Sequence, residues 1–289
     1  MPETQLKFTP YGNADFVYIR EEGLAYVDKT QFIEVLERCG SNYPFIVRPR
    51  RFGKTLSTNM LEAYYDEAAA DQFDRVFAGT YIGSHKTPLA SQFRVLHLDF
   101  SGIASPNHQV LAAEFQETVL SGVRSYFQRY PHPEQNEVLK GTFPSASALI
   151  SRFFSLLTEE FPRKLYVIID EYDQFANEVP SQDLEHFKAM TSSEGFLKNF
   201  FTKLKAATNR LVSRIFITGV TSISLDSMTS GFSISTNITT FPAFADLYGF
   251  TEAELRELVP QVLDISKWGL NVDDLVARMR EWYDGCLLY

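Results

Sequence analysis

The sequence predicts an α/β protein built on a doubly wound parallel sheet with helices on both faces. Four short apolar runs of strand length alternate along the chain with segments whose apolar residues recur at helical spacing. The third run, Leu165–Ile169, does not alternate with polar residues, which is typical of a central strand covered on both faces. A glycine-containing loop and a helix follow the first run directly. This order predicts a binding site at the carboxyl ends of the strands.

Capping signals and apolar runs define the elements of the first half of the chain. Asp28 and Gln31 match a capping box with Asp28 as the cap, which predicts a helix from about Lys29 to Cys39 that ends at Gly40. The next predicted elements are a strand at Phe45–Val47, a helix after Thr55, a strand at Val95–Phe100 and a helix over residues 109–129 that ends before Pro131 and Pro133.

The second half continues the alternation and then changes character. Its predicted elements are a helix over about residues 146–160, the strand Leu165–Ile169, a mostly helical section over Leu184–Asn209, a strand at Arg214–Thr218, a Ser-, Thr- and Gly-rich segment over 219–245 with an edge strand at Asn237–Phe241, and a last helix from Asn271 to Asp284 that ends at Gly285. Thr251 and Glu254 form a second capping box. We expect a core over residues 1–248 and a small lid-like helical appendage over residues 249–289.

Composition limits the classes of function. The chain has 289 residues, 45% of them hydrophobic, which is enough to bury a large core. Its net charge of −9 argues against a surface made for nucleic acid, so we expect weak or no direct nucleic-acid binding. The two cysteines, Cys39 and Cys286, provide neither a disulfide framework nor metal-ligand spacing. With no signal peptide and no long apolar stretch, the sequence predicts a cytoplasmic protein that does not enter a membrane.

A phosphate-binding loop is predicted directly after the first strand. Gly53 lets backbone N–H groups close around phosphate, Lys54 reaches the terminal phosphates, and the Thr55 hydroxyl binds Mg²⁺. The usual pattern is G-x-x-x-x-G-K-[ST], and Arg48 occupies the place of its first Gly. The residues that we predict to contact the nucleotide here are Arg48, Pro49, Arg50, Arg51, Phe52, Gly53, Lys54, Thr55 and Leu56.

Two adjacent carboxylates follow the third strand and suit a division of labour. Asp170 is predicted to hold Mg²⁺ through water, and Glu171 to orient and deprotonate an attacking water. Asp173 is a weaker candidate for the same shell. Thr218, at the end of the fourth strand, is a candidate sensor of the γ-phosphate. The alternatives are that the acidic residues cap the next helix and that Thr218 is a plain buried residue.

Three arginines in or next to the phosphate-binding loop allow two interpretations. Arg48, Arg50 and Arg51 form either a solvated basic cluster or a set in which at least one side chain contacts phosphate and offsets the missing Gly. For an arginine that acts on a neighbouring subunit, the nearby candidates are Arg210, Arg214 and Arg256.

Seven ordered motifs together resemble the AAA-ATPase-like domain family. They are Tyr26–Ile33, Arg48–Thr55, Ile169–Asp173, Phe216–Gly219, Ser230–Phe232, Gly249–Glu254 and Trp282–Gly285. The resemblance covers about residues 8–285, and the R-P-R-R-F-G-K form of the loop is the family's own, so Arg48 is expected there. The family commonly stands before a PD-(D/E)xK nuclease-like domain. It implies a P-loop ATPase of the additional-strand, catalytic-Glu group, with Lys54, Thr55, Asp170 and Glu171 in the roles given above.

The resemblance also implies positions outside the loop. It suggests that the segment containing Tyr26, Asp28, Lys29 and Thr30 lies near the adenine. After the last motif the family usually continues into a Tyr and an Asn-Pro segment, whereas this chain has Cys286-Leu-Leu-Tyr289. We therefore expect the appendage to be truncated.

These observations predict an ATP- and Mg²⁺-binding protein that hydrolyses ATP slowly. Its expected role is a conformational switch for a protein partner or for a C-terminal nuclease-like domain absent from this chain, and a homo-oligomer is possible. Two alternatives stay open: a small-molecule kinase that uses the same loop, and a scaffold that binds ATP without hydrolysis. GTP is disfavoured because the sequence has no N-K-x-D tetrapeptide.

Overall fold

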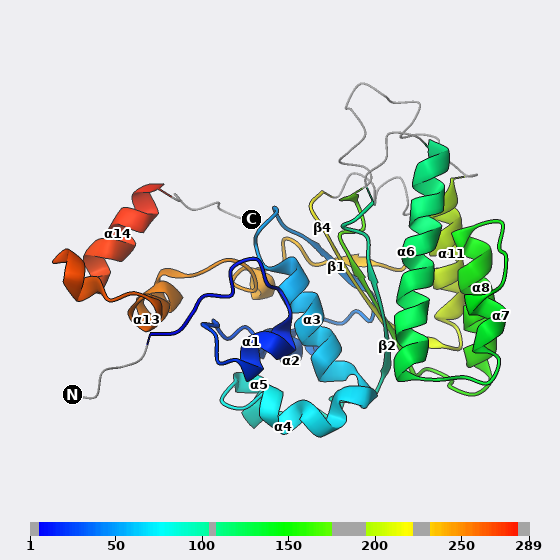
Figure 1. The fold of residues 1–289 in the computed structure, drawn as a ribbon, viewed down its shortest axis with the longest axis horizontal. Helices are drawn as coiled ribbons and strands as arrows, with labels where there is room; N and C mark the ends of the chain where they lie inside the picture. Colours follow the sequence, from blue (N-terminus) through cyan, green and yellow to red (C-terminus); the bar gives the residue numbers. More distant parts are fainter. Residues whose placement is uncertain (1–5, 104–107, 175–194, 222–231, 283–289) are drawn as a thin grey trace.

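Parallel strands form the centre of the molecule (Figure 1). A computed structural model describes residues 6–103, 108–174, 195–221 and 232–282. Within these residues one sheet has the strand order β2-β3-β4-β1-β5, and every pairing is parallel. The strands are β1 (Pro44–Val47), β2 (Arg94–Asp99), β3 (Leu165–Asp170), β4 (Val212–Gly219) and β5 (Thr236–Asn237). The α/β class and the four main strands are confirmed. The edge strand predicted at Asn237–Phe241 is observed as the two-residue strand β5, which shares only Asn237 with the prediction.

Helices cover the two faces of the sheet (Figure 1). They are α1 (Phe16–Glu21), α2 (Gln31–Arg38), α3 (Lys54–Tyr65), α4 (Phe73–Val76), α5 (Tyr81–Ser84), α6 (His108–Arg129), α7 (Gln135–Leu139), α8 (Ala146–Thr158), α11 (Phe196–Ala207), α13 (Glu252–Val262) and α14 (Val272–Trp282). Short 3₁₀ helices span Glu67–Gln72, Pro242–Phe244 and Ile265–Trp268. The first part of the predicted section Leu184–Asn209 and the residue Gly285 lie outside the described residues.

The central strand β3 shows why the sheet is doubly wound. All six of its residues are buried. Val167 and Ile169 belong to the apolar cluster shared with α6, α8 and α11, whereas Tyr166 and Ile168 belong to the cluster shared with α3. Because successive side chains of a strand point to opposite faces, one uninterrupted apolar run fills two cores.

One of the two predicted capping boxes is wrong and the other is confirmed. Helix α2 begins at Gln31 with Thr30 at its N-cap and no side-chain cap. The Asp28 carboxylate instead accepts the N–H of Thr30 (2.9 Å) and that of Tyr81 (2.6 Å), a partner distant in sequence. At α13, Thr251 and Glu254 make both bonds of the capping box.

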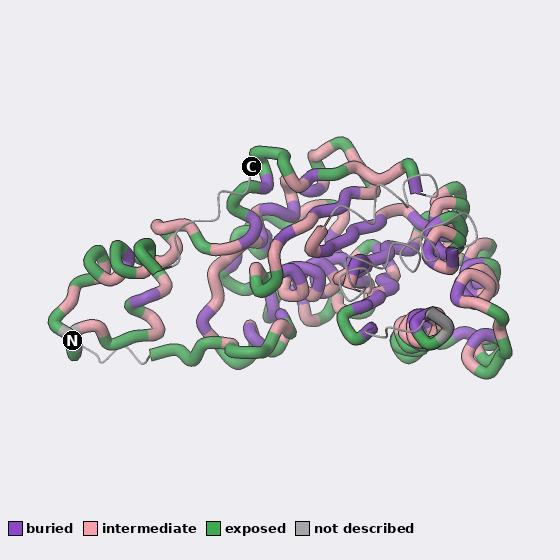
Figure 2. Tube along the Cα trace, turned by 90° about the horizontal axis from the view of Figure 1, so that it is seen from above, coloured by how far each residue is buried: buried purple, intermediate pink, exposed green. Residues whose placement is uncertain are grey.

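The C-terminal helices α13 and α14 lie beyond the β1 side of the sheet (Figure 1) and contain few buried residues (Figure 2). The Arg256 guanidinium joins them by a 2.8 Å ion pair with Asp273. Lys29 attaches α13 to the N-terminal segment, because its Nζ lies 2.6 Å from Glu254 Oε1 and donates to the Asp246 carbonyl oxygen (2.6 Å). None of the described helices combines the length and apolar character that a membrane span needs.

A polar network surrounds the edge strand β2 and connects helices from both faces of the sheet. His97 Nδ1 on β2 lies 2.6 Å from Glu62 Oε2 on α3. Arg129, the last residue of α6, pairs with Glu62 and donates to the Val95 carbonyl oxygen (2.8 Å). Burial alone lowers the pKa of His97, but the bond to Glu62 and the charges of Glu62, Asp170 and Asp99 outweigh it and raise the pKa above 6.5.

Glycine is required at the carboxyl end of β4. A Cβ atom on Gly219 would stand 2.7 Å from Asp173 Oδ1 and closer still to the ring of Tyr172. Neither neighbour is free to move, because Tyr172 donates its hydroxyl to the Thr221 carbonyl oxygen and Asp173 accepts the N–H groups of Val220 and Thr221. Close packing therefore excludes a side chain at this position.

The raised pKa of His97 predicts a pH-dependent contribution to stability. Because the pKa of His97 is higher in the folded than in the unfolded protein, protonated His97 stabilises the fold. This stabilisation is complete below about pH 6.5 and is lost as pH rises through the folded-state pKa. Denaturant unfolding of the parent and His97→Gln from about pH 6 to 9 should therefore show a free-energy difference that shrinks with rising pH. In a Glu62→Gln background this pH dependence should largely disappear. A difference that grows with pH contradicts the interpretation.

The crowding around Gly219 predicts that Gly219→Ala destabilises the protein by about 1–3 kcal/mol, the usual effect of overpacking. Gly102→Ala is the matched control, because a Cβ atom there meets no atom within 4 Å. Urea unfolding of both variants gives the comparison. If both substitutions lower the free energy of unfolding equally, the close contacts around Gly219 do not exclude a side chain.

Candidate functional site

A tight loop, residues 48–53, connects β1 to α3. Gly53 is the N-cap of α3 and has φ +90° and ψ 20°, a conformation that favours glycine. Arg51 also has a left-handed backbone, with φ +69°. No side chain caps the twelve-residue helix α3. The N–H groups of its first turn and its dipole therefore point at the loop, an arrangement suited to an anion.

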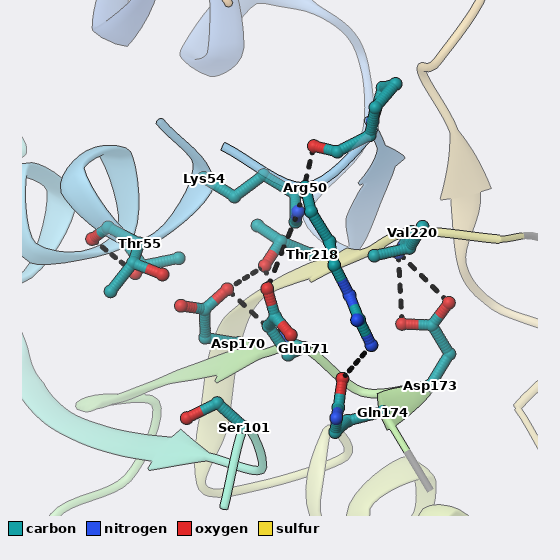
Figure 3. A network of polar contacts seen from close by, with 12 residues as sticks. Arg50, Lys54, Thr55, Ser101, Asp170, Glu171, Asp173, Gln174, Thr218 and Val220 are labelled. Carbon is teal, nitrogen blue, oxygen red and sulfur yellow. Dashed lines mark hydrogen bonds and ion pairs between the residues drawn. The ribbon is translucent and has the colours of Figure 1, made fainter. Parts of the chain in front are cut away.

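Lys54, the first residue of α3, lies under this loop. Its side chain is almost completely buried, and its Nζ donates to the Pro49 carbonyl oxygen (3.2 Å). The same Nζ lies 3.6 Å from Glu171 Oε1 (Figure 3). The lysine from the first predicted motif and the glutamate from the second are therefore neighbours, although 117 positions separate them in the sequence.

Asp170 ends β3 and is fully buried. Its Oδ1 accepts the N–H of Glu171 (3.0 Å) and the hydroxyl of Thr218 on the neighbouring strand β4 (Figure 3). Its Oδ2 is buried and has no hydrogen-bond partner among the described residues. Buried carboxylate oxygens are normally satisfied, so this atom fits a water bound to a metal ion.

Glu171 follows β3 in a backbone conformation rare for residues other than glycine, with φ +50°. Its N–H also lies 3.4 Å from Thr218 Oγ1. Burial raises the pKa of Glu171, Lys54 opposes this, and the charges of Asp170 and Asp173 add to the increase. The unusual backbone aims a carboxylate of increased basicity into the site, as expected for a proton acceptor.

Asp173 has a different surrounding from the one predicted. Its buried carboxylate accepts the N–H of Val220 (3.0 Å), the N–H of Thr221 (2.5 Å) and the Thr221 hydroxyl (2.9 Å). These bonds assign Asp173 to the loop that follows β4 rather than to a metal shell.

Arg48 is buried and its guanidinium contacts backbone carbonyl groups. Nη1 donates to Val47 (2.9 Å) and Thr239 (3.0 Å), and Nη2 donates to Phe244 (3.4 Å). The cation also faces the Tyr248 ring at 5.9 Å. Burial lowers the pKa of Arg48. The predicted phosphate contact of Arg48 has no support in this geometry, because the side chain joins β1 to the segment before α13.

The other loop residues divide between the surface and the core. Arg50 and Arg51 are exposed, and Arg50 Nη2 donates to Gln174 Oε1 (3.0 Å). Phe52 and Leu56 pack against the apolar cluster on the α3 face of the sheet. Thr55 lies in the first turn of α3, where its carbonyl oxygen accepts the Thr58 hydroxyl (2.9 Å).

The segment implied to lie near adenine packs beside α3. The Tyr26 hydroxyl contacts Met60 Sδ of α3 at 3.7 Å. Buried Thr30 accepts the N–H of Ile82 (3.1 Å) in α5. The described side-chain bonds of Asp28, Lys29 and Thr30 thus go to neighbouring backbone, to α5, to the Asp246 carbonyl oxygen and to Glu254 of α13, and not to the phosphate loop.

Sequence reasoning missed two polar residues around the site. Gln174 binds Arg50, and the only sequence signal is its place in the turn after the third strand. Tyr248 lies 2.8 Å from Ser57 Oγ through its hydroxyl, and Ser57 in turn donates to the Lys54 carbonyl oxygen (2.6 Å). Its position beside the Gly249–Glu254 motif is the only signal for this contact.

Comparison with known proteins gives the family. The family model described as "Predicted AAA-ATPase" matches residues 10–229, which include the loop, both carboxylates and Thr218. The "Uncharacterized protein in vnfD 5'region" of Azotobacter chroococcum mcd 1 is 26% identical over 284 residues, which are 96% of this chain and 48% of that protein. The chain thus spans about half the length of this relative. No solved structure matches the present chain. Since the family model covers well over half of the sequence and includes Lys54, Asp170, Glu171 and Thr218, the chain belongs to the AAA-ATPase-like family.

Proposed function

We propose that this protein binds ATP with Mg²⁺ and hydrolyses it slowly, as a conformational switch. The observation that carries the proposal is the convergence of Lys54, Glu171, Asp170 and Thr218 at the carboxyl ends of adjacent parallel strands. Phosphoryl transfer requires mainly positioned positive charge, a metal ion and an oriented nucleophile. These four residues supply side chains for each requirement.

Each side chain has a definite role in this proposal. Lys54 and the N-terminus of α3 bind the β- and γ-phosphates. Thr55 and Asp170 would hold Mg²⁺, Asp170 through water and with its Oδ2, which has no partner among the described residues. Glu171 accepts a proton from the water whose oxygen attacks the γ-phosphorus, while the bond to the ADP oxygen breaks. Thr218 orients this water.

The strand order supports the additional-strand, catalytic-Glu group as the subtype. In the order β2-β3-β4-β1-β5, strand β4 lies between the strand that precedes the phosphate loop and the strand that carries Asp170. Thr218 on this intervening strand bonds Asp170, and it is the Cα partner of Ile46 on the strand that precedes the phosphate loop. A Glu directly after the metal carboxylate favours water over an alcohol as the acceptor.

The contact between Lys54 and Glu171 suits a slow enzyme. At 3.6 Å the ammonium and the carboxylate partly satisfy each other. Nucleotide binding would exchange this internal ion pair for contacts with phosphate and Mg²⁺. Such an exchange reduces the net free energy of nucleotide binding. It also makes the position of the Glu171 carboxylate depend on whether nucleotide is bound.

The N-terminal segment and the C-terminal helices are proposed to complete the nucleotide site. The adenine is proposed to lie near Tyr26–Thr30, and the helices within residues 249–289 to act as a lid, because Lys29 binds Glu254 of α13. The switch would act on a protein partner or on a C-terminal nuclease-like domain, and the greater length of the relative is consistent with further domains in the family. The acidic balance of the chain supports weak or no direct nucleic-acid binding. The cytoplasm is the proposed location.

Removing the lysine tests nucleotide binding. Lys54→Ala should weaken ATP binding by about 10- to 100-fold, since it deletes a charge-assisted contact to phosphate. Isothermal titration with ATP and Mg²⁺ measures this, and circular dichroism verifies the fold. Lys203→Ala, at an exposed position of α11, is the control and should bind as the parent does. Unchanged ATP affinity in folded Lys54→Ala would disprove the site.

Changing the carboxylate tests hydrolysis. Glu171→Gln should keep ATP binding and lower the hydrolysis rate by about 10²-fold or more, the usual effect of losing a positioned base. Phosphate release gives the rate, and release of phosphate and ADP in equal amounts without an added acceptor separates hydrolysis from kinase activity. Glu159→Gln, at an exposed position, serves as the control. Parent-like hydrolysis by Glu171→Gln would make Glu171 a structural residue.

A further inference from the structure

Asp99 is the last residue of β2 and lies beside Asp170 in the sheet. The two residues are Cα partners in parallel strands, and the Asp170 carbonyl oxygen accepts the N–H of Phe100 (3.1 Å). Figure 3 shows Ser101, which follows β2, on the same side of the polar network as Thr55 and Asp170. Neighbouring strands are about 5 Å apart, so the carboxylates of Asp99 and Asp170 start from adjacent positions.

The side chains of Asp99 and Asp170 lie on the same face of the sheet. Successive side chains of a strand point to opposite faces. Leu98 and Phe100 belong to the apolar cluster shared with α6, α8 and α11, so Asp99 between them faces α3. Ile169 belongs to the same cluster, so Asp170 faces α3 as well.

The contact between His97 and Glu62 shows how α3 lies on this face. His97 precedes Asp99 by two positions on β2, and its Nδ1 lies 2.6 Å from Glu62 Oε2. Thr55 and Glu62 are seven positions apart in α3, about two helical turns, so their side chains leave the helix in nearly the same direction. Since the loop after β1 leads directly into α3, this helix begins at the carboxyl ends of the strands. Thr55 therefore lies beyond Glu62 in the direction of Asp99.

Two buried polar atoms on this face have no hydrogen-bond partner among the described residues. They are Asp170 Oδ2 and His97 Nε2. Asp99 Oδ1 accepts the N–H of Ser101 (2.9 Å), and within the described part of the chain no bond to Asp99 Oδ2 is found. Buried polar atoms are normally satisfied by protein or by ordered water, and two neighbouring carboxylates repel each other. A hydrated cation would supply water to these atoms and offset the repulsion.

We propose that Asp99 holds the hydrated Mg²⁺ ion of the nucleotide together with Asp170 and Thr55. In the described ranges no group of three or more His, Cys, Asp or Glu side chains could hold a metal ion, so the ion also needs oxygens from the nucleotide. Such a site suits Mg²⁺, which keeps several waters and is usually bound by one or two carboxylates and substrate phosphates. Asp99 thus acts on the ion rather than on the nucleotide. The inference rests on the proposed binding of ATP with Mg²⁺.

Asp99→Asn tests this role, because the amide oxygen can still accept the Ser101 N–H while the negative charge is removed. Isothermal titration with a non-hydrolysable ATP analogue, at a series of Mg²⁺ concentrations, measures the gain in affinity that the ion provides. Asp99→Asn should need about tenfold more Mg²⁺ for half of this gain, the usual effect of changing a residue around a metal site. In EDTA it should bind the analogue at least as tightly as the parent, because one negative charge near the phosphates is gone.

A second aspartate serves as the matched control. Asp74→Asn, at an exposed position of α4, should keep the Mg²⁺ dependence of the parent. Circular dichroism verifies the fold of each variant. Parent-like Mg²⁺ dependence of Asp99→Asn overturns the inference. An equal loss of affinity with Mg²⁺ and with EDTA overturns it as well, because the effect would then be on the loop and not on the ion.

Combining two substitutions tests whether both carboxylates act on one ion. Asp170→Asn should also raise the Mg²⁺ concentration that is needed. The double variant should then show less than the product of the two single effects, because side chains that share a partner are not independent. Multiplicative effects would mean that Asp99 and Asp170 act separately and would overturn the inference.

These measurements separate the inference from the proposed function. The analogue is not hydrolysed, so a parent that binds it with Mg²⁺ but does not hydrolyse ATP contradicts only the proposed activity. If the parent responds to Mg²⁺ and Asp99→Asn responds equally, only the inference fails. If the parent binds no nucleotide, both fail.

Discussion

The buried carboxylate of Asp170 is the constraint on which the geometry of the site depends. A charge inside a fully buried strand is unfavourable unless it is hydrogen-bonded, and the bonds available come from Glu171 and from Thr218 on the adjacent strand. This fixes the register of β3 against β4. Strand β4 also positions the strand that precedes the phosphate loop. Thr218 is the Cα partner of Ile46 on β1, and the Gly219 carbonyl oxygen accepts the Arg48 N–H (3.0 Å).

Much of the fold is readable from the sequence because its strongest signals are local. A buried parallel strand needs an uninterrupted apolar run, so the ends of β3 and β4 are predicted to within two residues. The capping box of Thr251 and Glu254 uses partners three residues apart and is also readable. Asp28 has the same local pattern, but a backbone N–H 53 residues away competes for its carboxylate. That competitor is invisible until the chain has folded.

The candidate site shows the same division. The motif spacing brings Lys54 and Glu171 together because parallel strands end at one edge of a sheet, while their chemical roles stay predictions. Arg48 and Arg50 belong to one basic tripeptide segment, yet one is buried against carbonyl groups and the other crosses the surface to Gln174. An irregular loop has no repeating geometry like that of a helix or a strand. The sequence therefore cannot predict in which direction either side chain points or which partner it meets.

The shared carboxylate of Glu254 has a consequence for the order of folding. One of its oxygens accepts the Thr251 N–H (2.8 Å) at the start of α13, and the other pairs with Lys29, 225 positions earlier in the chain. A contact of this sequence separation is entropically unfavourable in an open chain and forms readily only when the intervening core is already ordered. Helix α13 should therefore dock last. By the same argument we expect α13 to detach from the N-terminal segment before the sheet unfolds.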